Sequence, residues 1–346
     1  MQGRREGDEK SLILMDQDFD NSFAMITDLI RGHQRYTILL SAITSGILQT
    51  LIQNGPMRVE NLVSELECDK SKIDLWIQAI VDIGILKKDG DFVEISRGMT
   101  KFLNPKSAIY QGDSIISKQE SPWYSKGNFL MSNAQLGEKT RREMTPEFLK
   151  VVGQHAMRGE IQEITKILST MTEFTSARKL LDIGGGHGLY SISLCQQNID
   201  LNSVILDQPH IIEATKENVT KFRMEKQIEV ISGDMNKEIP GTGYDLMLAS
   251  HILYHKETLE PHIRRFVSGL RNGGLFISNH KFSNDWKLPE NDVLTALEHE
   301  MIRDFHQMIP ESDFLEILEA QGLDLMVTRR VQSTTGLSTL HIARKM

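Results

Sequence analysis

The sequence has few cysteines, no excess of basic residues and no long apolar run. Only Cys68 and Cys195 occur, far apart and in no metal-ligand spacing, so we expect two reduced structural thiols and a reducing, cytoplasmic location. The formal net charge of −8 disfavours a nucleic-acid partner, because clustered Lys and Arg are needed to neutralise phosphates. No apolar run approaches the roughly 18 residues that a membrane span needs. Residues 1–20 have mixed charges, which predicts a flexible tail and not a secretory signal. The expected partner is a small molecule.

What is present favours two domains joined by a connector. The 346 residues are 40% apolar and 25% charged, which suits a globular chain with one larger and one smaller domain. Residues 20–53 have apolar side chains spaced by three and four, and residues 57–96 predict helix, turn, helix and a hairpin turning at Asp89-Gly90. That is the order of a winged helix, expected over residues 21–105, with a helical connector over residues 106–176. Acidic residues match the basic ones there, so we do not expect it to bind DNA.

In residues 177–346 the sequence pattern differs: it predicts short apolar strands that alternate with amphipathic helices. The predicted strands read "RKLLDI", "SVILD", "IEVIS", "YDLMLAS", "GGLFIS", "LDLMVTRRV" and "LSTLHIAR". Such alternation predicts a mostly parallel sheet with helices on both faces. The expected fold class is therefore α/β, with a Rossmann-like seven-stranded domain preceded by a mostly α-helical winged-helix domain.

The stretch "LLDIGGGHGLY", residues 180–190, is an apolar strand that ends in an acid and runs into a glycine-rich turn. Glycines allow the backbone to approach a ligand closely, and an open sheet binds its ligand at the carboxyl ends of the strands. The dinucleotide fingerprint G-x-G-x-x-G fails, because its third glycine would fall on Leu189. Two more acids follow strands: Asp207 ends the second, and Asp234 comes after the third.

This pattern resembles the first motif of class I S-adenosylmethionine-dependent methyltransferases. The resemblance implies S-adenosyl-L-methionine as cofactor and S-adenosyl-L-homocysteine as product. It implies that the methionine end is held at the turn, the ribose hydroxyls by Asp207, and the adenine by Asp234 and Met235. The implied cofactor-binding residues are Asp182, Gly184, Gly186, Gly188, Asp207, Gln208, Asp234, Met235 and Ser250.

Over nearly the whole chain, the order of winged helix, helical connector and catalytic domain resembles the small-molecule O-methyltransferases of plants and bacteria. The stretch "SAITSGILQTLIQNGPMRVENLVSELECDKSKIDLWIQAIVDIGILKKDGDFVEIS" matches the pattern of that family's dimerisation domain. The resemblance implies a homodimer that buries apolar surface from residues 26–51 and from the helix of Trp76.

The segment "SHILYHKETL", residues 250–259, departs from the family at the position of its catalytic base. The family has a histidine in "LHDW", and the alignment puts Tyr254 in its place and His255 in the place of the aspartate. Two glutamates that brace the family's histidine correspond here to Asn279 and about Met308. A neutral phenol with an ordinary pKa near 10 is a poor base at pH 7, although it can orient an acceptor.

Three interpretations stay open at this point. His255 enters the site through a shortened loop and serves as base for O-methyl transfer, with Tyr254 orienting the acceptor. Alternatively no strong base is needed, because the acceptor is an activated carbon, a nitrogen, or an already ionised thiol or phenol. The letters "ILY" also resemble a branch of bacteriochlorophyllide C-methyltransferases, which favours a large macrocyclic or polycyclic acceptor. In the third, the chain binds the cofactor without transferring a methyl group, as a non-transferase or a winged-helix regulator. The expected acceptor contacts are His251, His299, Met301 and Met308, and no metal is expected.

Overall fold

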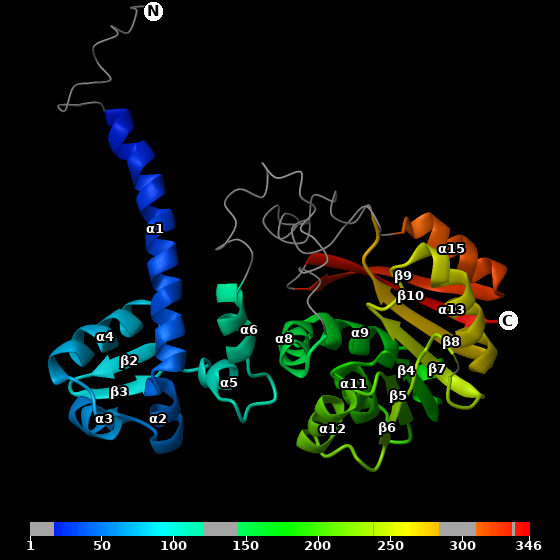
Figure 1. Cartoon of the computed structure of the whole chain (residues 1–346), viewed down its shortest axis with the longest axis horizontal. Coiled ribbons are helices and arrows are strands. Elements are labelled where there is room, and N and C mark those ends of the chain that lie inside the picture. The colour runs from blue at the N-terminus through cyan, green and yellow to red at the C-terminus, as the bar shows by residue number, and fades with distance from the viewer. Residues whose placement is uncertain (1–16, 121–143, 238, 284–308, 334–335) are drawn as a thin grey trace, which may run out of the picture. The chain divides into compact units, whose positions relative to one another are not determined.

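The chain forms two compact units in the computed structural model, which describes residues 17–120, 144–237, 239–283, 309–333 and 336–346 (Figure 1). The division between the units falls after Gly112. The predicted helical connector, residues 106–176, therefore belongs mostly to the second unit and does not form a separate body.

The first unit is mostly helical and carries one small antiparallel sheet. Its helices are α1 (Gln17–Thr44), α2 (Ile47–Asn54), α3 (Val59–Leu66), α4 (Lys70–Asp82) and α5 (Thr100–Leu103), and its strands are β1 (Met57–Arg58), β2 (Leu86–Asp89) and β3 (Phe92–Ile95). The strands lie in the order β1-β3-β2. The expected sequence of helix, helix and hairpin is present, with the turn at Gly90 and Asp91, one residue later than predicted. Gly90 has a φ of 56°, which glycine adopts readily.

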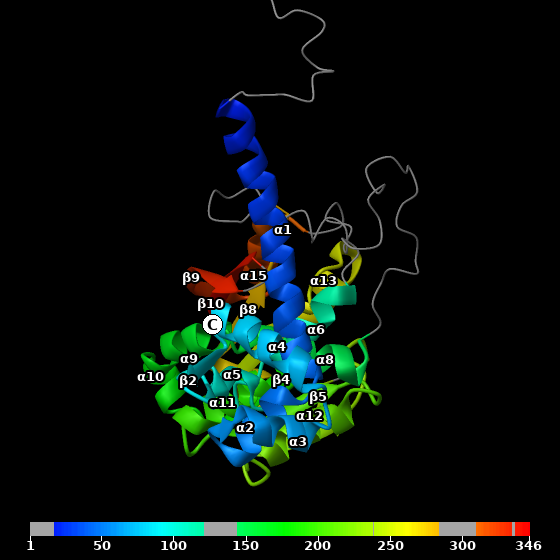
Figure 2. The ribbon, with the colours of Figure 1, turned by 90° about the vertical axis from the view of Figure 1, so that its left-hand side faces the viewer.

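Helix α1 extends well past the other elements of its unit (Figure 2). Its last turns are buried at Leu40 and Ala42, whereas its earlier turns expose large apolar side chains. These exposed residues are Phe23, Met25, Ile26, Leu29 and Ile30. In the described part of the chain, no single helix has the length and apolarity to cross a membrane; Phe23–Thr44 and Ile47–Asn54 pass that test only as a pair bent by 54°.

The second unit is built on a seven-stranded sheet in the order β6-β5-β4-β7-β8-β10-β9. The strands are β4 (Lys179–Ile183), β5 (Asn202–Asp207), β6 (Ile228–Ser232), β7 (Tyr244–Ser250), β8 (Leu270–His280), β9 (Leu323–Ser333) and β10 (Gly336–Lys345). The first five strands in that order are parallel, and β10 runs antiparallel to both neighbours. The predicted α/β fold class with its seven strands is thus confirmed.

Helices cover both faces of this sheet (Figure 1). One buried cluster joins α9 (Glu160–Ser169), α11 (Leu189–Gln197) and α12 (Ile212–Lys221) to the sheet through residues such as Leu180 and Leu246. The other cluster joins α13 (Lys256–Gly269) and α15 (Glu311–Ala320) to it through Leu181 and Met247. The shorter elements of this unit are α6 (Gly112–Ile116), the 3₁₀ turn η2 (Ser117–Glu120), α8 (Pro146–Ala156) and α10 (Thr172–Thr175). Alternation of side chains along each strand is what gives each face its own core.

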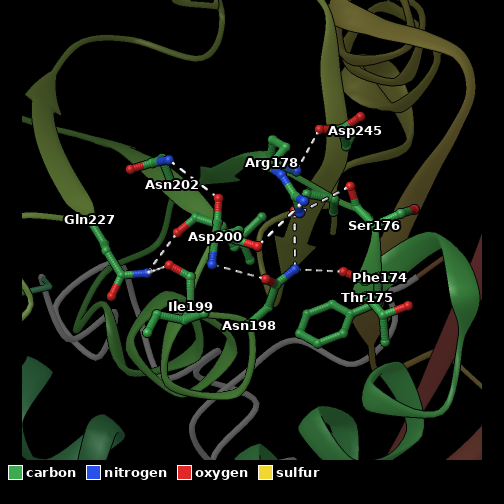
Figure 3. Close-up of polar contacts among 12 residues, drawn as sticks. Phe174, Thr175, Ser176, Arg178, Asn198, Ile199, Asp200, Asn202, Gln227 and Asp245 are labelled. Atoms are coloured by element: carbon green, nitrogen blue, oxygen red, sulfur yellow. Dashed lines mark hydrogen bonds and ion pairs between the residues drawn. The ribbon is translucent and has the colours of Figure 1, made fainter.

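At the amino ends of β4 and β5, the buried Asn198 forms hydrogen bonds both to the segment that leads into β4 and to the segment that leads into β5 (Figure 3). The Asn198 side-chain amide donates to the carbonyls of Phe174, at 2.8 Å, and Ala177, at 3.1 Å. Its Oδ1 accepts the backbone N–H of Asp200 at 3.1 Å. Next to it, Asp245 Oδ2 accepts the backbone N–H groups of Arg178, at 2.8 Å, and Lys179, at 2.9 Å. These bonds fix where the parallel strands begin.

We predict that Asn198→Ala lowers the free energy of unfolding of the second unit by about 1–3 kcal/mol, because two buried carbonyls lose their donor. Urea unfolding followed by circular dichroism measures this change. Asn202→Ala is the control, since its side chain makes a single exposed contact of 3.4 Å. Equal losses for the two variants would contradict the role given to Asn198.

Candidate functional site

A cavity of about 410 Å³ opens at the carboxyl ends of the parallel strands. The turn after β4, the end of β5 and the segment after β6 contribute one part of its lining. The rest comes mainly from η2, α8, the starts of α9 and α11, the end of β7 and the residue after β8. Of the nine predicted cofactor residues, eight line it: Asp182, Gly184, Gly186, Asp207, Gln208, Asp234, Met235 and Ser250. Gly188 lies just behind this lining, as the N-cap of α11.

The glycine-rich turn has the backbone that only glycine takes easily. Gly184, Gly186 and Gly188 have φ values of 62°, 51° and 71°. A Cβ added to Gly184 would lie 2.7 Å from Cγ2 of Ile252, so there is also no room for a side chain. The turn therefore presents bare backbone to the cavity.

Two of the strand-end acids, Asp182 and Asp207, accept hydrogen bonds from other groups of the protein. Asp182 is buried, and its Oδ2 accepts the Ser191 hydroxyl at 2.7 Å. Burial raises the pKa of Asp182 to about 7, and the neighbouring carboxylate of Asp207 adds to this rise. Asp207 accepts the backbone N–H of Gly186 on Oδ2 and that of Gln208 on Oδ1, each at 2.7 Å. Burial raises the pKa of Asp207 as well, although these two bonds oppose it. Each oxygen of Asp207 retains acceptor capacity for a ligand hydroxyl.

The third acid follows β6 and is more open to solvent. Asp234 Oδ1 accepts the backbone N–H of Asn236 at 2.9 Å and its side-chain amide at 2.7 Å. The half-buried Met235 beside it packs against the core formed with α13. This pair thus offers a carboxylate next to an apolar surface, as a heterocyclic base with an exocyclic amine requires.

A network of hydrogen bonds converges on Glu160, the first residue of α9. Its Oε1 accepts from Nε2 of His251 at 2.9 Å, from Nδ2 of Asn279 at 2.8 Å and from the hydroxyl of Tyr190. On the other side of the imidazole, Nδ1 of His251 lies 2.8 Å from the Tyr254 hydroxyl. The network therefore links α9, α11, β8 and the loop after β7.

The carboxylate at the centre of this network is ionised. Burial alone would raise the pKa of Glu160, but the attraction and hydrogen bond of His251, the Tyr190 hydroxyl and the charge of Lys281 outweigh it and lower the pKa to about 2. An ionised carboxylate only accepts hydrogen bonds, so Nε2 of His251 carries a proton directed at it; in the neutral form of this imidazole, Nδ1 is then the acceptor that faces Tyr254.

The loop that carries His251 is fixed by a second histidine. His251 has a φ of 57°, an uncommon left-handed conformation for a residue other than glycine. Nε2 of the buried His280 accepts the next two backbone N–H groups, from Ile252 at 3.3 Å and Leu253 at 3.1 Å. Burial lowers the pKa of His280 well below its usual value, which keeps it neutral and able to accept these bonds. The hydrogen bonds to His280 thus stabilise the left-handed backbone conformation of His251.

The predicted catalytic and acceptor residues separate in the structure. His251 lines the cavity, and Tyr254 is half-buried behind it with its hydroxyl directed at the His251 ring. His255 is exposed, forms the N-cap of α13 and is absent from the cavity lining, which does not favour a role as base; that role stays a prediction. His299, Met301 and Met308 lie outside the described residues.

Sequence reasoning missed Glu160, the centre of the network. The residue follows Gly159 at the start of a helix, in a stretch with no strand-end pattern, and nothing local marks it. Asn279 was noted only as the replacement of a family glutamate, yet it donates to Glu160 from the end of β8. In the described ranges no group of three or more His, Cys, Asp or Glu side chains is arranged to hold a metal ion.

Comparison with known proteins gives a consistent result. A family model described as an O-methyltransferase domain matches residues 139–302. An uncharacterised protein of Methanocaldococcus jannaschii is 27% identical over 73% of this chain and 66% of its own length. The 3-hydroxy-5-methyl-1-naphthoate 3-O-methyltransferase of Streptomyces sahachiroi is 22% identical over 66% of this chain and 68% of its own. The matches span about two thirds of these relatives' lengths.

Among solved structures, human N-acetylserotonin methyltransferase in complex with S-adenosylmethionine superimposes with a TM-score of 0.66 at 16% identity. That likeness covers 97% of this chain and 99% of the human one. At this identity it establishes the fold, including the seven-stranded sheet and the helical unit before it.

We expect the parent protein to lose stability as the pH rises from about 4 to about 7, because of Asp182. We predict that the Asp182→Asn variant does not show this loss. With a pKa of about 7 in the fold against 3.8 in the unfolded chain, the carboxyl ionises first in the unfolded state, which costs at most about 4 kcal/mol above pH 7. Unfolding midpoints of variant and parent across this range measure it.

The quantity to compare is the difference between the unfolding midpoints of the Asp182→Asn variant and the parent at each pH. The half-buried His155 and the buried His187 have pKa values lowered to about 4 and destabilise the fold as the pH falls below 6.5, in both proteins alike. Glu160 titrates lower still. A difference that does not change with pH would contradict the assignment.

Proposed function

Because this chain carries the O-methyltransferase domain of the class I S-adenosylmethionine-dependent small-molecule methyltransferases, we propose that it transfers a methyl group to a small apolar or aromatic molecule, first of all to a hydroxyl oxygen. The observation that carries the proposal is that the glycine turn and the acids at the carboxyl ends of β4, β5 and β6 all line one cavity. C- or N-methyl transfer is the alternative, and cofactor binding without transfer is the second.

The residues around the cavity fit the cofactor. Asp207 has acceptor capacity on both oxygens for the two ribose hydroxyls, and Asp234 with Met235 suits the adenine. The three consecutive glycines Gly184 to Gly186, which carry no side chains, allow the methionine end to approach the backbone. When bound, S-adenosylmethionine supplies a methyl group made electrophilic by the sulfonium. The protein's part is to orient the acceptor, exclude water and remove a proton.

For that proton we propose His251. In its neutral form the imidazole holds the lone pair on Nδ1, because the Nε2 proton is directed at ionised Glu160, 2.9 Å away. A proton that leaves the acceptor hydroxyl passes to Nδ1, either directly or through the Tyr254 hydroxyl at 2.8 Å. The imidazolium that results is stabilised by the Glu160 carboxylate, which therefore acts as a positioning residue. An acceptor carbon or nitrogen would not require this transfer.

We also propose a homodimer in which the first unit supplies the contact. The support is the row of apolar side chains on α1, where Met25 and Leu29 are 72% and 77% exposed, and the neighbouring exposed Leu75 and Trp76 of α4. Exposed apolar side chains gathered in this way are typical of association sites. Light scattering of the purified chain tests this, and a mass of one chain at micromolar concentration would contradict it.

The function predicts that the purified chain binds S-adenosylhomocysteine in a calorimetric titration and transfers label from S-adenosylmethionine to a small molecule in an extract of its own cell. Mass spectrometry of the product distinguishes an O-methyl from a C- or N-methyl group. Absence of cofactor binding would exclude the enzyme, and binding without any labelled product would favour the non-transferase alternative.

We predict that His251→Ala lowers turnover at least about 100-fold, the range of general-base catalysis, while cofactor affinity stays within about twofold. His255→Ala serves as the matched comparison, because that side chain is exposed and outside the cavity lining. If His255→Ala alone abolishes turnover, His255 is the base. If neither variant loses turnover, the acceptor needs no histidine base.

A further inference from the structure

On the face of the sheet that α13 and α15 cover, three polar side chains each bury an atom that has no hydrogen-bond partner among the described residues. These atoms are Oγ of Ser278 and Nδ1 of His280, both on β8, and Nδ1 of His341, on β10. None of the three residues has any exposed surface. A buried polar atom without a partner costs about 1–3 kcal/mol, so we expect these three atoms to share one.

The register of the sheet brings the three side chains together. Ser278 lies directly opposite His341 in the antiparallel pair of β8 and β10, and His280 follows Ser278 by two residues. Residues in these relations point to the same face, with opposite Cβ atoms about 5 Å apart and diagonal ones roughly 7–8 Å apart. The ring of Phe314 lies beside both imidazoles, with its centroid 5.9 Å from that of His280 and 5.5 Å from that of His341.

The hydrogen bonds on the far side of each imidazole fix what its unpaired atom offers. Nε2 of His280 accepts two backbone N–H groups, so in the neutral ring Nδ1 carries the proton. Nε2 of His341 lies 2.9 Å from the Glu311 carboxylate, which also accepts from Arg330 at 2.9 Å. A carboxylate only accepts, so His341 carries its proton on Nε2, and in the neutral ring its Nδ1 is an acceptor.

The surroundings favour the neutral form of both rings. Burial lowers the pKa of His280 well below its usual value, and the nearby His341 adds to this. Burial also lowers the pKa of His341, with Arg330 acting in the same direction and Glu311 against it. The unpaired atoms are therefore a donor on His280, an acceptor on His341 and a hydroxyl on Ser278 that can act as either.

This combination matches one water molecule. Its oxygen can accept the Nδ1 proton of His280, and its two hydrogens can bind Nδ1 of His341 and Oγ of Ser278. Buried waters typically form about three hydrogen bonds with polar groups that otherwise have no partner. A metal ion does not fit these atoms, because the Nδ1 of His280 carries a proton and is not a ligand.

We propose that a buried water bridges Ser278, His280 and His341. Through this water, the Glu311 carboxylate selects the tautomer of His280 that accepts the backbone N–H groups of the loop after β7. Glu311 and His341 are thereby positioning residues for that loop, although they lie on α15 and β10. The proposal rests on the proposed function only in treating His251, on this loop, as the base.

All donors in this series point in one direction. The loop donates to Nε2 of His280, the Nδ1 proton of His280 goes to the water, the water donates to His341, and His341 donates to Glu311. Hydrogen bonds in such a series polarise one another, which strengthens each of them. Reversal of one member would leave two donors or two acceptors facing each other, so the tautomer at one end depends on the carboxylate at the other.

Two measurements on the full chain test the water and the tautomers. A crystal structure is expected to show one water within about 3.2 Å of Nδ1 of His280 and of His341. Imidazole ¹H–¹⁵N spectra at pH 7 are expected to show His280 neutral with its proton on Nδ1, and His341 neutral with its proton on Nε2. A structure without this water, or the opposite tautomer of either ring, overturns the proposal.

His341→Leu tests the positioning role, because it removes both the acceptor of the water and the link to Glu311. In this variant the His280 ring is expected to populate both tautomers. The backbone N–H groups of Ile252 and Leu253 are expected to exchange with solvent at least tenfold faster, since they lose part of their acceptor. An unchanged tautomer with unchanged exchange contradicts the role.

Phe282→Leu is the matched control for packing. It removes part of a ring whose centroid lies 5.5 Å from that of His341, and it removes no polar atom. It is expected to lower the unfolding midpoint while the His280 tautomer and the exchange of the loop stay as in the parent. If Phe282→Leu changes both readings as much as His341→Leu does, these residues act by packing alone and the proposal fails.

A second pair of variants serves if His341→Leu does not fold. Glu311 is partly exposed, so Glu311→Leu removes the acceptor of His341 without opening the core. It is expected to speed the exchange of the loop N–H groups at least threefold. Glu311→Gln keeps an acceptor oxygen and is expected to restore the exchange rate of the parent. Equal rates in Glu311→Leu and the parent overturn the proposal.

These readings are separate from the proposed function, because neither the tautomer nor the exchange rate requires methyl transfer. Turnover of S-adenosylmethionine and affinity for S-adenosylhomocysteine are measured in parallel. A chain with the bridging water and the expected tautomers but no methyl transfer contradicts only the function. A chain that transfers methyl but lacks the water, or keeps the His280 tautomer in His341→Leu, contradicts only this proposal.

Discussion

One buried negative charge organises the reacting part of this molecule. Glu160 accepts hydrogen bonds from Tyr190, His251 and Asn279, which come from α11, the loop after β7 and the end of β8. A carboxylate removed from water is stable only when donors compensate its charge, so the three hydrogen bonds to Oε1 favour one position of these segments relative to α9. The glycine turn precedes α11 directly, so the same charge also sets the relation between the cofactor region and the acceptor region.

The cofactor region was predictable because its signals are local. An apolar strand, an acid at its end and a glycine turn lie within a few consecutive residues, and parallel strands bring their carboxyl ends to one edge of the sheet. The prediction of Asp182, Asp207 and Asp234 at one edge needed only strand order, and the structure lines one cavity with all three. The seven strands were predictable for the same reason, since alternation and length mark them without reference to distant residues.

The reacting region was not predictable, because its partners are distant in sequence. Glu160 and His251 are 91 residues apart, and Glu160 and Asn279 are 119 apart. The direction of the His251 side chain depends on a left-handed backbone that His280 stabilises. A sequence alignment reveals neither the backbone conformation of His251 nor its hydrogen-bonded support by His280. The alignment therefore drew attention to Tyr254 and His255, while the side chain that lines the cavity is three residues earlier than Tyr254.

The position of β10 has a consequence for how the second unit is made. This strand, Gly336–Lys345, lies between β8 and β9, so it is an inner strand of the sheet although it is the last one in sequence. While the chain is being synthesised, β8 and β9 each present an unpaired edge until residues beyond 336 have left the ribosome. Open strand edges are templates for pairing between molecules. The interval before β10 inserts is therefore the period in which the nascent protein depends most on dilution or on chaperones to remain unaggregated.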